Sequence, residues 1–369
     1  MKLMKTTEAV GQVLCHDITQ IIPGVKKDAV FRKGHIITKE DIPVLLSVGK
    51  DTIYIWENDE TMMHENEAAE VLYRMSACGT NSNEADAEGH CEAAESGTFG
   101  GTASKMHPSP VKEGKIEVIA DCDGLLKVDS EKLKKVNSFG EMMIATRHGN
   151  TTVKKGDKLA GTRIIPLVIK KDKLKEASNI CEDGPILDIK PFVVRKAAII
   201  TTGNEVYHGR IQDAFTPVIE KKIAEFGAQM MFHEVFDDDD KKITDGCLRA
   251  IEAGAEIVFC TGGMSVDPDD KTPLAIKNTG ARIVSYGSPV LPGAMFLLSY
   301  YDAGDRLVPI CGLPGCAMYN KRTIFDIVLP RLMARDMIYA DELAGLGEGG
   351  LCLNCDVCTF PNCGFGKGF

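Results

Sequence analysis

After residue 195, apolar and polar positions follow a regular pattern that predicts strands alternating with helices. Short apolar runs are separated by stretches in which apolar residues recur three or four positions apart, as they do on one face of a helix. The expected strands lie at 197–200, 230–236, 257–260, 283–286, 295–300 and 307–311, and the expected helices at 215–226, 243–251, 271–278 and 317–332. Such alternation is typical of a mainly parallel sheet with helices on both faces, so we expect an α/β domain at 193–335.

Before residue 193 the pattern is less regular and predicts β-rich structure. Residues 1–74 and 111–192 both mix strand-like apolar runs with turns, and a helix is expected at 130–136. Residues 75–110 hold mostly small and polar side chains, which bury too little apolar surface to offset the entropy of ordering, so we expect a flexible insertion there. A Gly- and Cys-rich segment, 336–369, follows the α/β domain as a separate tail.

Composition narrows the range of partners. The 369 residues include 43 Lys and Arg against 53 Asp and Glu, a formal net charge of −10 at pH 7. Affinity for phosphate backbones and anionic headgroups depends on a basic surface, so we expect neither nucleic acid nor a membrane as partner. One local pocket can still bind an anion, so a phosphorylated small molecule remains a candidate ligand.

The cellular compartment is inferred from targeting signals and cysteine content. The sequence has no apolar run near the roughly 18 residues that a membrane helix needs, and no apolar segment typical of an export signal. We therefore expect a cytoplasmic protein. In that compartment the 13 cysteines are expected to be thiols or metal ligands, not a disulfide framework.

Four loops that follow predicted strands hold the candidate chemistry. In an open α/β sheet, ligands bind beyond the carboxyl ends of the parallel strands, so these loops are expected to line one edge. The loops are TTGNE at 201–205, DDDD at 237–240, TGGMSVDPDD at 261–270 and GLPGC at 312–316. Together they supply tight glycine turns, hydroxyls and carboxylates.

The third loop predicts phosphate binding. Gly262, Gly263 and Ser265 precede a helix, where backbone N–H groups can cradle a phosphate. The alternative is that the glycines only make a tight turn. Carboxylates beside a phosphate indicate a bridging Mg²⁺, since the like charges would otherwise repel each other. Those that can converge on the same edge are Glu205, Asp238, Asp239, Asp269 and Asp270. For any aspartate of 237–240 the alternative is a solvated turn and helix N-cap.

The tail predicts a metal site. It carries four cysteines with two, two and four residues between them: Cys352, Cys355, Cys358 and Cys363. Four thiols this close, in a compartment where disulfides do not persist, favour Zn²⁺ or an iron–sulfur cluster as the ligand, and both stay open. Free thiols are the less favoured alternative, because exposed thiols are prone to oxidation.

Taken in order, the motifs of residues 196–335 resemble the molybdopterin-binding domain of molybdenum cofactor biosynthesis proteins. TGNE, the acidic turn, TGGMSVDPDD and CGLPG are most similar to the molybdopterin molybdenumtransferase family, which includes the gephyrin E-domain. Residues 1–190 resemble the N-terminal β-rich region of that family only loosely, and the tail has no counterpart there. In that family, adenylated molybdopterin and molybdate react to give molybdenum cofactor and AMP, with Mg²⁺ assisting.

The resemblance implies a transferase, its residues and its partners. It matches Glu205, Asp238 and Asp270 with the family's catalytic acids. It places the ligand-binding residues at Thr202, Gly203, Gly262, Gly263, Ser265, Pro314 and Gly315. It also implies a pterin phosphate or nucleotide as ligand, molybdopterin and molybdate as substrates, a homodimer, and a molybdoenzyme as candidate recipient of the cofactor.

Departures from the family pattern keep a second function open. Leu291 and Ala294 stand where the family carries two lysines in a KPGKP-like segment, and Ala317 stands for its second proline after GLPG. The family's Asp before Gly-Tyr-Ala is not found in the N-terminal region. Loss of two cations weakens an oxyanion pocket. The alternative function is a non-catalytic carrier, maturation factor or sensor for the cofactor.

Overall fold

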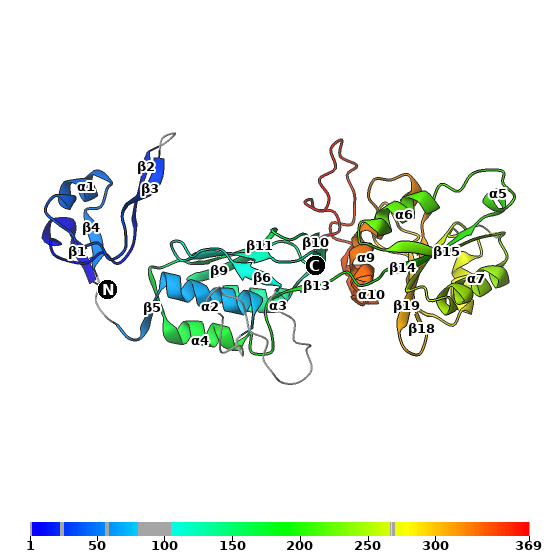
Figure 1. The fold of residues 1–369 in the computed structure, drawn as a ribbon, viewed down its shortest axis with the longest axis horizontal. Coiled ribbons are helices and arrows are strands. Elements are labelled where there is room, and N and C mark those ends of the chain that lie inside the picture. Colours follow the sequence, from blue (N-terminus) through cyan, green and yellow to red (C-terminus); the bar gives the residue numbers. More distant parts are fainter. Residues whose placement is uncertain are drawn as a thin grey trace. The chain divides into compact units, whose positions relative to one another are not determined.

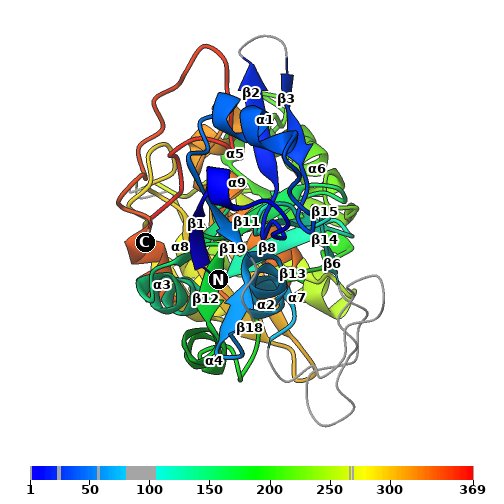
Figure 2. The ribbon, with the colours of Figure 1, turned by 90° about the vertical axis from the view of Figure 1, so that its left-hand side faces the viewer.

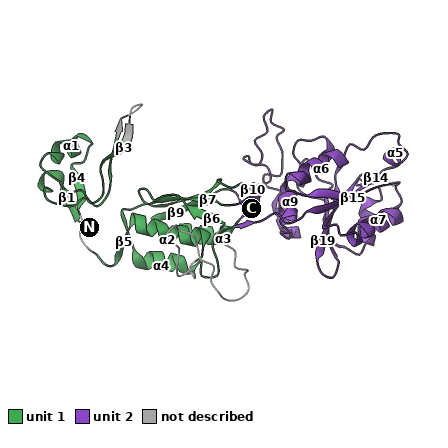
Figure 3. Ribbon diagram, viewed as in Figure 1, with its two compact units in different colours: residues 1–121, 128–147, 155–188 green, residues 122–127, 148–154, 189–369 purple. Residues whose placement is uncertain are grey.

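The computed structural model describes residues 2–22, 26–55, 59–79, 105–265, 267 and 270–368. The chain forms two compact units (Figure 3). Unit 1 comprises residues 1–121, 128–147 and 155–188, and unit 2 comprises 122–127, 148–154 and 189–369. Most of the expected insertion at 75–110 lies outside the described residues. Within the described ranges, no helix is long and apolar enough to cross a membrane.

The centre of unit 2 is a six-stranded sheet in the order β15-β14-β16-β19-β18-β17. Figure 1 labels β14, β15, β18 and β19 of this sheet. Its strands are β14 (Lys196–Thr202), β15 (Gln229–Phe236), β16 (Ile257–Thr261), β17 (Arg282–Tyr286), β18 (Leu297–Asp302) and β19 (Leu307–Leu313). The first four strands in this order pair in parallel, whereas β18 and β17 pair antiparallel. The predicted mainly parallel sheet is therefore confirmed.

Helices cover both faces of this sheet. They are α6 (Thr216–Ala224) and α9 (Ile324–Met333) on one face, and α7 (Asp240–Glu252) and α8 (Thr272–Asn278) on the other. Successive side chains of β14 point to opposite faces of the sheet, as they do in any strand. Ile199 joins the cluster with α6 and α9, while Ile200 joins the cluster with α7 and α8, and both are fully buried. The α/β architecture expected from the sequence is confirmed.

The expected helix at 317–332 is wrong in its first part. Gly315–Met318 is a single 3-10 turn, η2, and α9 begins only at Ile324. The start of α9 is fixed by a capping box: Thr323 Oγ1 accepts a hydrogen bond from Phe325 N, and the Asp326 carboxylate accepts one from Thr323 N at 2.9 Å. The spacing of apolar residues does not reveal a helix start that is set by polar capping residues.

The tail is part of unit 2 in the structure. Phe365 is buried in the same core as α9, and Phe360, Cys352 and Cys363 pack against that core. The backbone of Leu291 pairs with the tail, donating to Gly350 O and accepting from Cys352 N, each at 2.8 Å. The remaining elements of this region are α5 (Asn204–Tyr207), α10 (Ala340–Gly345) and the three-stranded sheet of β8 (Gly124–Val128), β10 (Thr151–Val153) and β13 (Leu187–Lys190).

An ion cluster holds that three-stranded sheet to the end of α9. The buried carboxylate of Asp336 accepts hydrogen bonds from Lys127 Nζ on β8 at 2.8 Å and from Lys190 Nζ on β13 at 2.6 Å. Arg331 Nε of α9 donates to the same carboxylate at 2.6 Å. The four charges therefore join three elements that are far apart in the sequence.

Unit 1 contains both strands and helices. Its strands are β1 (Lys2–Lys5), β2 (Ile18–Ile22), β3 (Lys26–Phe31), β4 (Thr52–Ile55), β5 (Met62–His64), β6 (Met106–Pro108), β7 (Lys115–Ala120), β9 (Met142–Thr146), β11 (Lys158–Ile164) and β12 (Val168–Lys170). Its helical segments are η1 (Thr6–Glu8), α1 (Asp41–Ser47), α2 (Glu65–Ala77), α3 (Ser130–Ser138) and α4 (Lys171–Asn179). The strands β2 and β3 form an antiparallel hairpin (Figure 2).

Two features of unit 1 differ from the sequence-based expectations. The helix α2 was expected to be β-rich sequence, but it packs against β7 and β11 with a buried face that includes Ala69, Leu72 and Met75. Cys78, directly after α2, is disulfide-bonded, so the expectation of free thiols is wrong for this residue.

Candidate functional site

The carboxyl ends of the four parallel strands of unit 2 lie at one edge, which we call the carboxyl edge. Thr201 pairs with Thr261, and Thr261 in turn pairs with Leu313. On the other side of β14, Thr202 pairs with Phe236. Because the strands run parallel and end level, the four loops that follow them leave from the same edge. The predicted meeting of these loops is thus present in the structure.

Two threonines tie the first and third loops together. Thr202 Oγ1 donates to Thr261 O at 3.1 Å and lies 3.1 Å from Thr272 Oγ1. Thr272 Oγ1 donates to Gly262 O at 2.9 Å, and Thr272 N donates to Gly263 O at 3.2 Å. The turn at Gly262–Gly263 is therefore held between the end of β14 and the start of α8. Thr272 was not among the residues predicted for the site.

Both glycines of that turn are required by the structure. Gly262 and Gly263 have φ angles of +82° and +55°, in the left-handed region. A Cβ on Gly262 would lie 2.1 Å from Thr202 O, and a Cβ on Gly263 would lie 2.8 Å from Thr272 Oγ1. Each missing Cβ would point at other atoms of the protein, so these contacts satisfy the alternative of a tight turn.

Glu205 and Asp238 lie together at the first turn of α5. Asp238 Oδ2 accepts a hydrogen bond from Asn204 N at 3.1 Å, which anchors the acidic turn after β15 to the loop after β14. The exposed Glu205 folds back over Gly203, since a Cβ on that glycine would lie 3.0 Å from Glu205 Oε1. Two predicted acids from different loops are thus neighbours.

Asp270 is the last residue of the loop that carries the two glycines. Its Oδ2 accepts from Asp267 N at 3.1 Å, and its own N–H donates to Asp267 O at 2.9 Å. Burial raises the pKa of Tyr286, and the negative charge of Asp270 adds to that rise. Tyr286 in turn donates to Met264 O at 3.1 Å, so both ends of this loop lie near Tyr286.

The other candidate acids differ in their roles. Asp239 accepts from Lys241 N and Lys242 N and caps α7, which is the alternative considered for this run. Asp237 Oδ2 pairs with Lys242 Nζ at 2.7 Å, and this contact raises the pKa of Lys242. Asp269 lies outside the described residues. In the described part of the chain, no three His, Cys, Asp or Glu side chains come together as a metal site.

Three further predicted site residues differ in their burial and packing. Ser265 is exposed, and Pro314 is buried ahead of η2. A Cβ on Gly315 would meet nothing within 4 Å, so packing does not require glycine there.

Thr261 was missed by the sequence analysis. Its hydroxyl is fully buried at the carboxyl end of β16 and has no hydrogen-bond partner among the residues that the structure describes. A buried polar group without a partner costs about 1–3 kcal/mol, so this hydroxyl is suited to a buried water oxygen. The available signal was a polar residue ending a strand that is otherwise apolar.

A second polar cluster anchors the segment after α5. Asp213 Oδ2 accepts hydrogen bonds from Thr201 Oγ1 at 3.0 Å and from Thr216 Oγ1 at 2.5 Å. His233 Nε2 lies 3.1 Å from Thr201 Oγ1. Burial raises the pKa of Asp213, but the hydrogen bonds from Thr216 and Thr201 outweigh it, and the pKa lies below its ordinary value. Asp213 therefore pins the loop that carries Glu205 to β14.

The four tail cysteines are divided between core and solvent. Cys352 and Cys363 pack against the hydrophobic core, whereas Cys355 and Cys358 are exposed. All four belong to the described residues, and they do not form a metal-binding group in the structure. The structure thus gives no support to Zn²⁺ or an iron–sulfur cluster in the tail.

The comparisons with known proteins concern mainly the α/β domain. Residues 198–334 match a family described as a probable molybdopterin binding domain. The α/β domain is similar to this family. Residues 3–57 match a domain of unknown function (DUF8806). The resemblance found in the motifs is thereby confirmed, and it places the domain among those of molybdenum cofactor biosynthesis.

Individual relatives match only part of the chain. A protein of Bacillus subtilis named for competence-damage induction is 30% identical over 88 residues, which are 24% of this chain and 21% of that protein. A molybdopterin molybdenumtransferase of Staphylococcus epidermidis is 26% identical over 159 residues, 41% of this chain and 38% of that enzyme. The chain spans only about a fifth (20–21%) of the first curated relatives that it matches.

Among solved structures, the tungsten cofactor synthesizing protein MoaB from Pyrococcus furiosus is similar with 18% sequence identity and a TM-score of 0.30. The match covers 38% of this chain and 89% of that one.

Proposed function

We propose that the protein acts in molybdenum cofactor biosynthesis by binding adenylated molybdopterin at the carboxyl edge and inserting molybdate, with release of AMP. The observation that carries the proposal is the tight glycine turn at Gly262–Gly263, which leaves the carboxyl edge beside the acids of two neighbouring loops. Backbone N–H groups of such a turn can bind a phosphate.

Mg²⁺ belongs to the proposal as a partner of the bound phosphates. Mg²⁺ at phosphate sites is usually held by one or two carboxylates together with phosphate oxygens and waters, so a closed protein cage is not required. Glu205 and Asp238 lie at the same turn and are the pair that would hold it. When bound, the ion would offset the negative charge that develops on the departing AMP phosphate.

The chain's own residues position the reactants. Thr202 and Thr272 hold the glycine turn, and Asp213 holds the loop that carries Glu205. The two dithiolene sulfurs of the pterin, not a protein side chain, would take the metal from molybdate. Asp270 lies at the far end of the same loop, near Tyr286, and would limit the position of the pterin on that side.

A second candidate function is a non-catalytic carrier or sensor of the same cofactor. It is favoured by the segment at 291–295, where the related transferases are expected to carry two lysines. Leu291 instead uses its backbone to pair with the tail, and Ala294 offers no charge. An oxyanion such as molybdate would lose two cationic partners there.

One experiment separates these candidates. The full chain, loaded with Mg²⁺, is incubated with adenylated molybdopterin with and without molybdate, and AMP release and pterin binding are both measured. We expect AMP release that depends on molybdate. Glu205→Ala is expected to lower the rate by about 100-fold or more, as removal of an electrostatic group at a reacting phosphate does.

The matched control is Glu220→Ala, which removes an exposed carboxylate from α6 and is expected to leave the rate unchanged. Tight pterin binding without AMP release would contradict the transferase and support the carrier. Failure of the folded protein to bind the pterin would exclude both.

A further inference from the structure

Tyr286 is an exposed aromatic residue at the carboxyl edge. It is the last residue of β17, which runs antiparallel to β18, and β18 runs antiparallel to β19. The strand β17 therefore has the same direction as the parallel strands and ends at the same edge. In the sheet register, Tyr286 pairs with Leu297, Leu297 pairs with Gly312, and Gly312 pairs with Cys260, the residue before Thr261.

Tyr286 points to the same face of the sheet as the core under α7 and α8. Directly opposite residues on neighbouring strands point to one face, and Leu297 and Cys260 both belong to that core. The hydroxyl of Tyr286 donates to Met264 O at 3.1 Å, and Met264 directly follows Gly263. The tyrosine side chain therefore extends from the edge strand toward the glycine turn.

The ring of Tyr286 combines exposure with a fixed position. The residue is 46% exposed, although its hydroxyl is held by Met264 O. A tyrosine has few side-chain torsions, and the hydrogen bond restricts them, so little conformational entropy is lost when a ligand packs on the ring. The other exposed tyrosines near this edge are less suited. Tyr319 is 74% exposed, and Tyr207 is packed edge-on against His208.

The charge near the ring favours a ligand that donates hydrogen bonds. Burial raises the pKa of Tyr286, and the charge of Asp270 raises it further, which places the carboxylate of Asp270 near this side chain. A carboxylate binds groups that donate hydrogen bonds. The pyrimidine ring of a pterin carries an amino group and a ring N–H side by side, whereas adenine carries its amino group between acceptor nitrogens. A pterin therefore fits this position better than an adenine.

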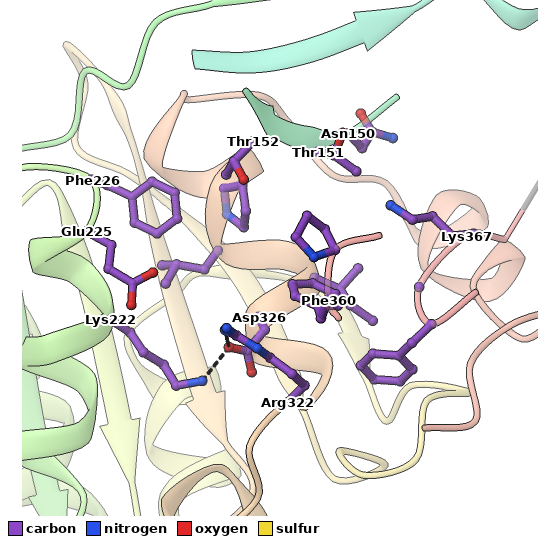
Figure 4. Close-up of a pocket in the computed structure, with 16 residues that line it drawn as sticks. Asn150, Thr151, Thr152, Lys222, Glu225, Phe226, Arg322, Asp326, Phe360 and Lys367 are labelled. Carbon is purple, nitrogen blue, oxygen red and sulfur yellow. Dashed lines mark hydrogen bonds and ion pairs between the residues drawn. The ribbon is translucent and has the colours of Figure 1, made fainter. Parts of the chain in front are cut away.

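The cavity of unit 2 is not an alternative position for the pterin. It is lined by α6, α9, β10 and the tail, and Asp326 pairs there with Lys222 and Arg322 (Figure 4). Its volume of about 140 Å³ is close to that of a cavity that holds one benzene molecule, and the fused rings of a pterin are larger. None of the described residues that line it belongs to β17 or to the loops of the carboxyl edge.

The order of the strands separates the aromatic side of the edge from its acidic side. Glu205 and Asp238 follow β14 and β15, on one side of β16, whereas β17 lies on the other side. A ligand with phosphates at one end and rings at the other can therefore bind across the edge. We propose that the pterin stacks on the ring of Tyr286 while its phosphate lies at the glycine turn. This assignment rests on the proposed function and adds the position of the pterin.

Calorimetric titration of the full chain tests the assignment with two phosphorylated probes. Neopterin monophosphate joins a pterin to a phosphate, and AMP joins an adenine to a phosphate. Tyr286→Leu is expected to weaken neopterin monophosphate binding about tenfold, as removal of a stacked aromatic ring does, and to leave the affinity for AMP unchanged. Tyr286→Phe keeps the ring and is expected to bind neopterin monophosphate within about threefold of the unmodified chain.

Pterin fluorescence reports stacking directly. It should be quenched on binding to the unmodified chain and to Tyr286→Phe, but not on binding to Tyr286→Leu. The matched control is Tyr339→Leu, which removes another exposed tyrosine of unit 2, at the start of α10, and should leave affinity and quenching unchanged. Unchanged neopterin monophosphate affinity in Tyr286→Leu, or an equal loss in Tyr286→Phe, would overturn the stacking role. A loss of affinity for AMP alone would place adenine on the ring and would also overturn it.

Turnover separates this assignment from the proposed function. With adenylated molybdopterin and molybdate, Tyr286→Leu is expected to raise KM about tenfold and to change kcat less, because stacking holds the substrate and the transition state alike. Stacking of neopterin monophosphate on Tyr286 without any AMP release from the unmodified chain would contradict the transferase and support the stacking role. Failure of the unmodified chain to bind either neopterin monophosphate or adenylated molybdopterin would contradict both.

Discussion

At the scale of single residues, the carboxyl edge depends on positions that only glycine can occupy. Gly262 shows this most clearly, because its backbone is left-handed and its missing Cβ leaves room for the carbonyl of Thr202. Gly315, in another loop of the same edge, has open space around it. The backbone and its neighbours therefore require glycine at position 262 but not at position 315.

This contrast gives a prediction about stability. Gly262→Ala is expected to reduce the free energy of unfolding by more than about 1 kcal/mol, because it adds both backbone strain and a clash with main-chain atoms. Gly315→Ala is expected to change it by less than about 0.5 kcal/mol. Urea unfolding of both variants measures the difference. Equal stability of the two variants would show that the turn is not built as described.

At the scale of elements, the segment between β14 and α6 is held at its far end by Asp213. The carboxylate joins β14 to the first turn of α6 through Thr201 and Thr216. The intervening residues, which include Glu205, are thereby fixed at both ends. A loop tied at both ends places its side chains more precisely than one that is free at one end.

Asp213→Ala is expected to release this segment. Amide hydrogen exchange at 204–212 should become faster, and pterin affinity should fall, while exchange within β16 stays slow. Asp245→Ala, which removes an exposed acid from α7, serves as control and should change neither quantity. Unchanged exchange at 204–212 in Asp213→Ala would argue against its positioning role.

The same scale shows what the sequence could predict. The strands β14 and β16 are continuous buried runs because both of their faces are covered, so they could be found from pattern alone. The parallel order of the strands also predicted that the loops after them lie at one edge of the sheet. The start of α9 could not be found in this way, since it depends on a polar cap. The helix α2 buries Leu72 and Met75 at helical spacing, a pattern that the sequence analysis missed.

The partners of the site residues also escaped the sequence analysis. Thr272 and Asp213 act through contacts with residues 70 and 12 positions away in the chain, such as Thr202 and Thr201. No local pattern marks such residues, because their roles depend on tertiary neighbours. The tail cysteines show the converse: their spacing predicted a metal site, but two of the thiols are used in packing.

At the scale of the whole molecule, the stability of unit 2 depends on the ion cluster at Asp336. Burial raises the pKa of this carboxyl, but hydrogen bonds from Lys127 and Lys190 and the charge of Arg331 outweigh it and lower the pKa from 3.8 to about 2. Burial also lowers the pKa of Lys127, which offsets part of the gain. The cluster therefore contributes at most about 2 kcal/mol, the value that such a shift corresponds to.

The sign of the pH dependence follows from the lowered pKa. The contribution of Asp336 is fully present above about pH 4 and is lost as the pH falls toward 2, where the folded state takes up the proton. Asp336→Asn is expected to lower the melting temperature at pH 7 and to flatten its decline between pH 4 and 2. A variant with the same pH profile as the unmodified chain would contradict the role of this cluster.

The central claim is that the loops of the carboxyl edge together bind a phosphorylated pterin. Hydrogen exchange of the full chain, followed by mass spectrometry with and without adenylated molybdopterin, tests it most directly. We predict slower exchange at 202–206 and at 261–265, and no change at 150–152 or in the tail. Protection that is absent from both loop segments, or confined to other parts of the chain, would contradict the account.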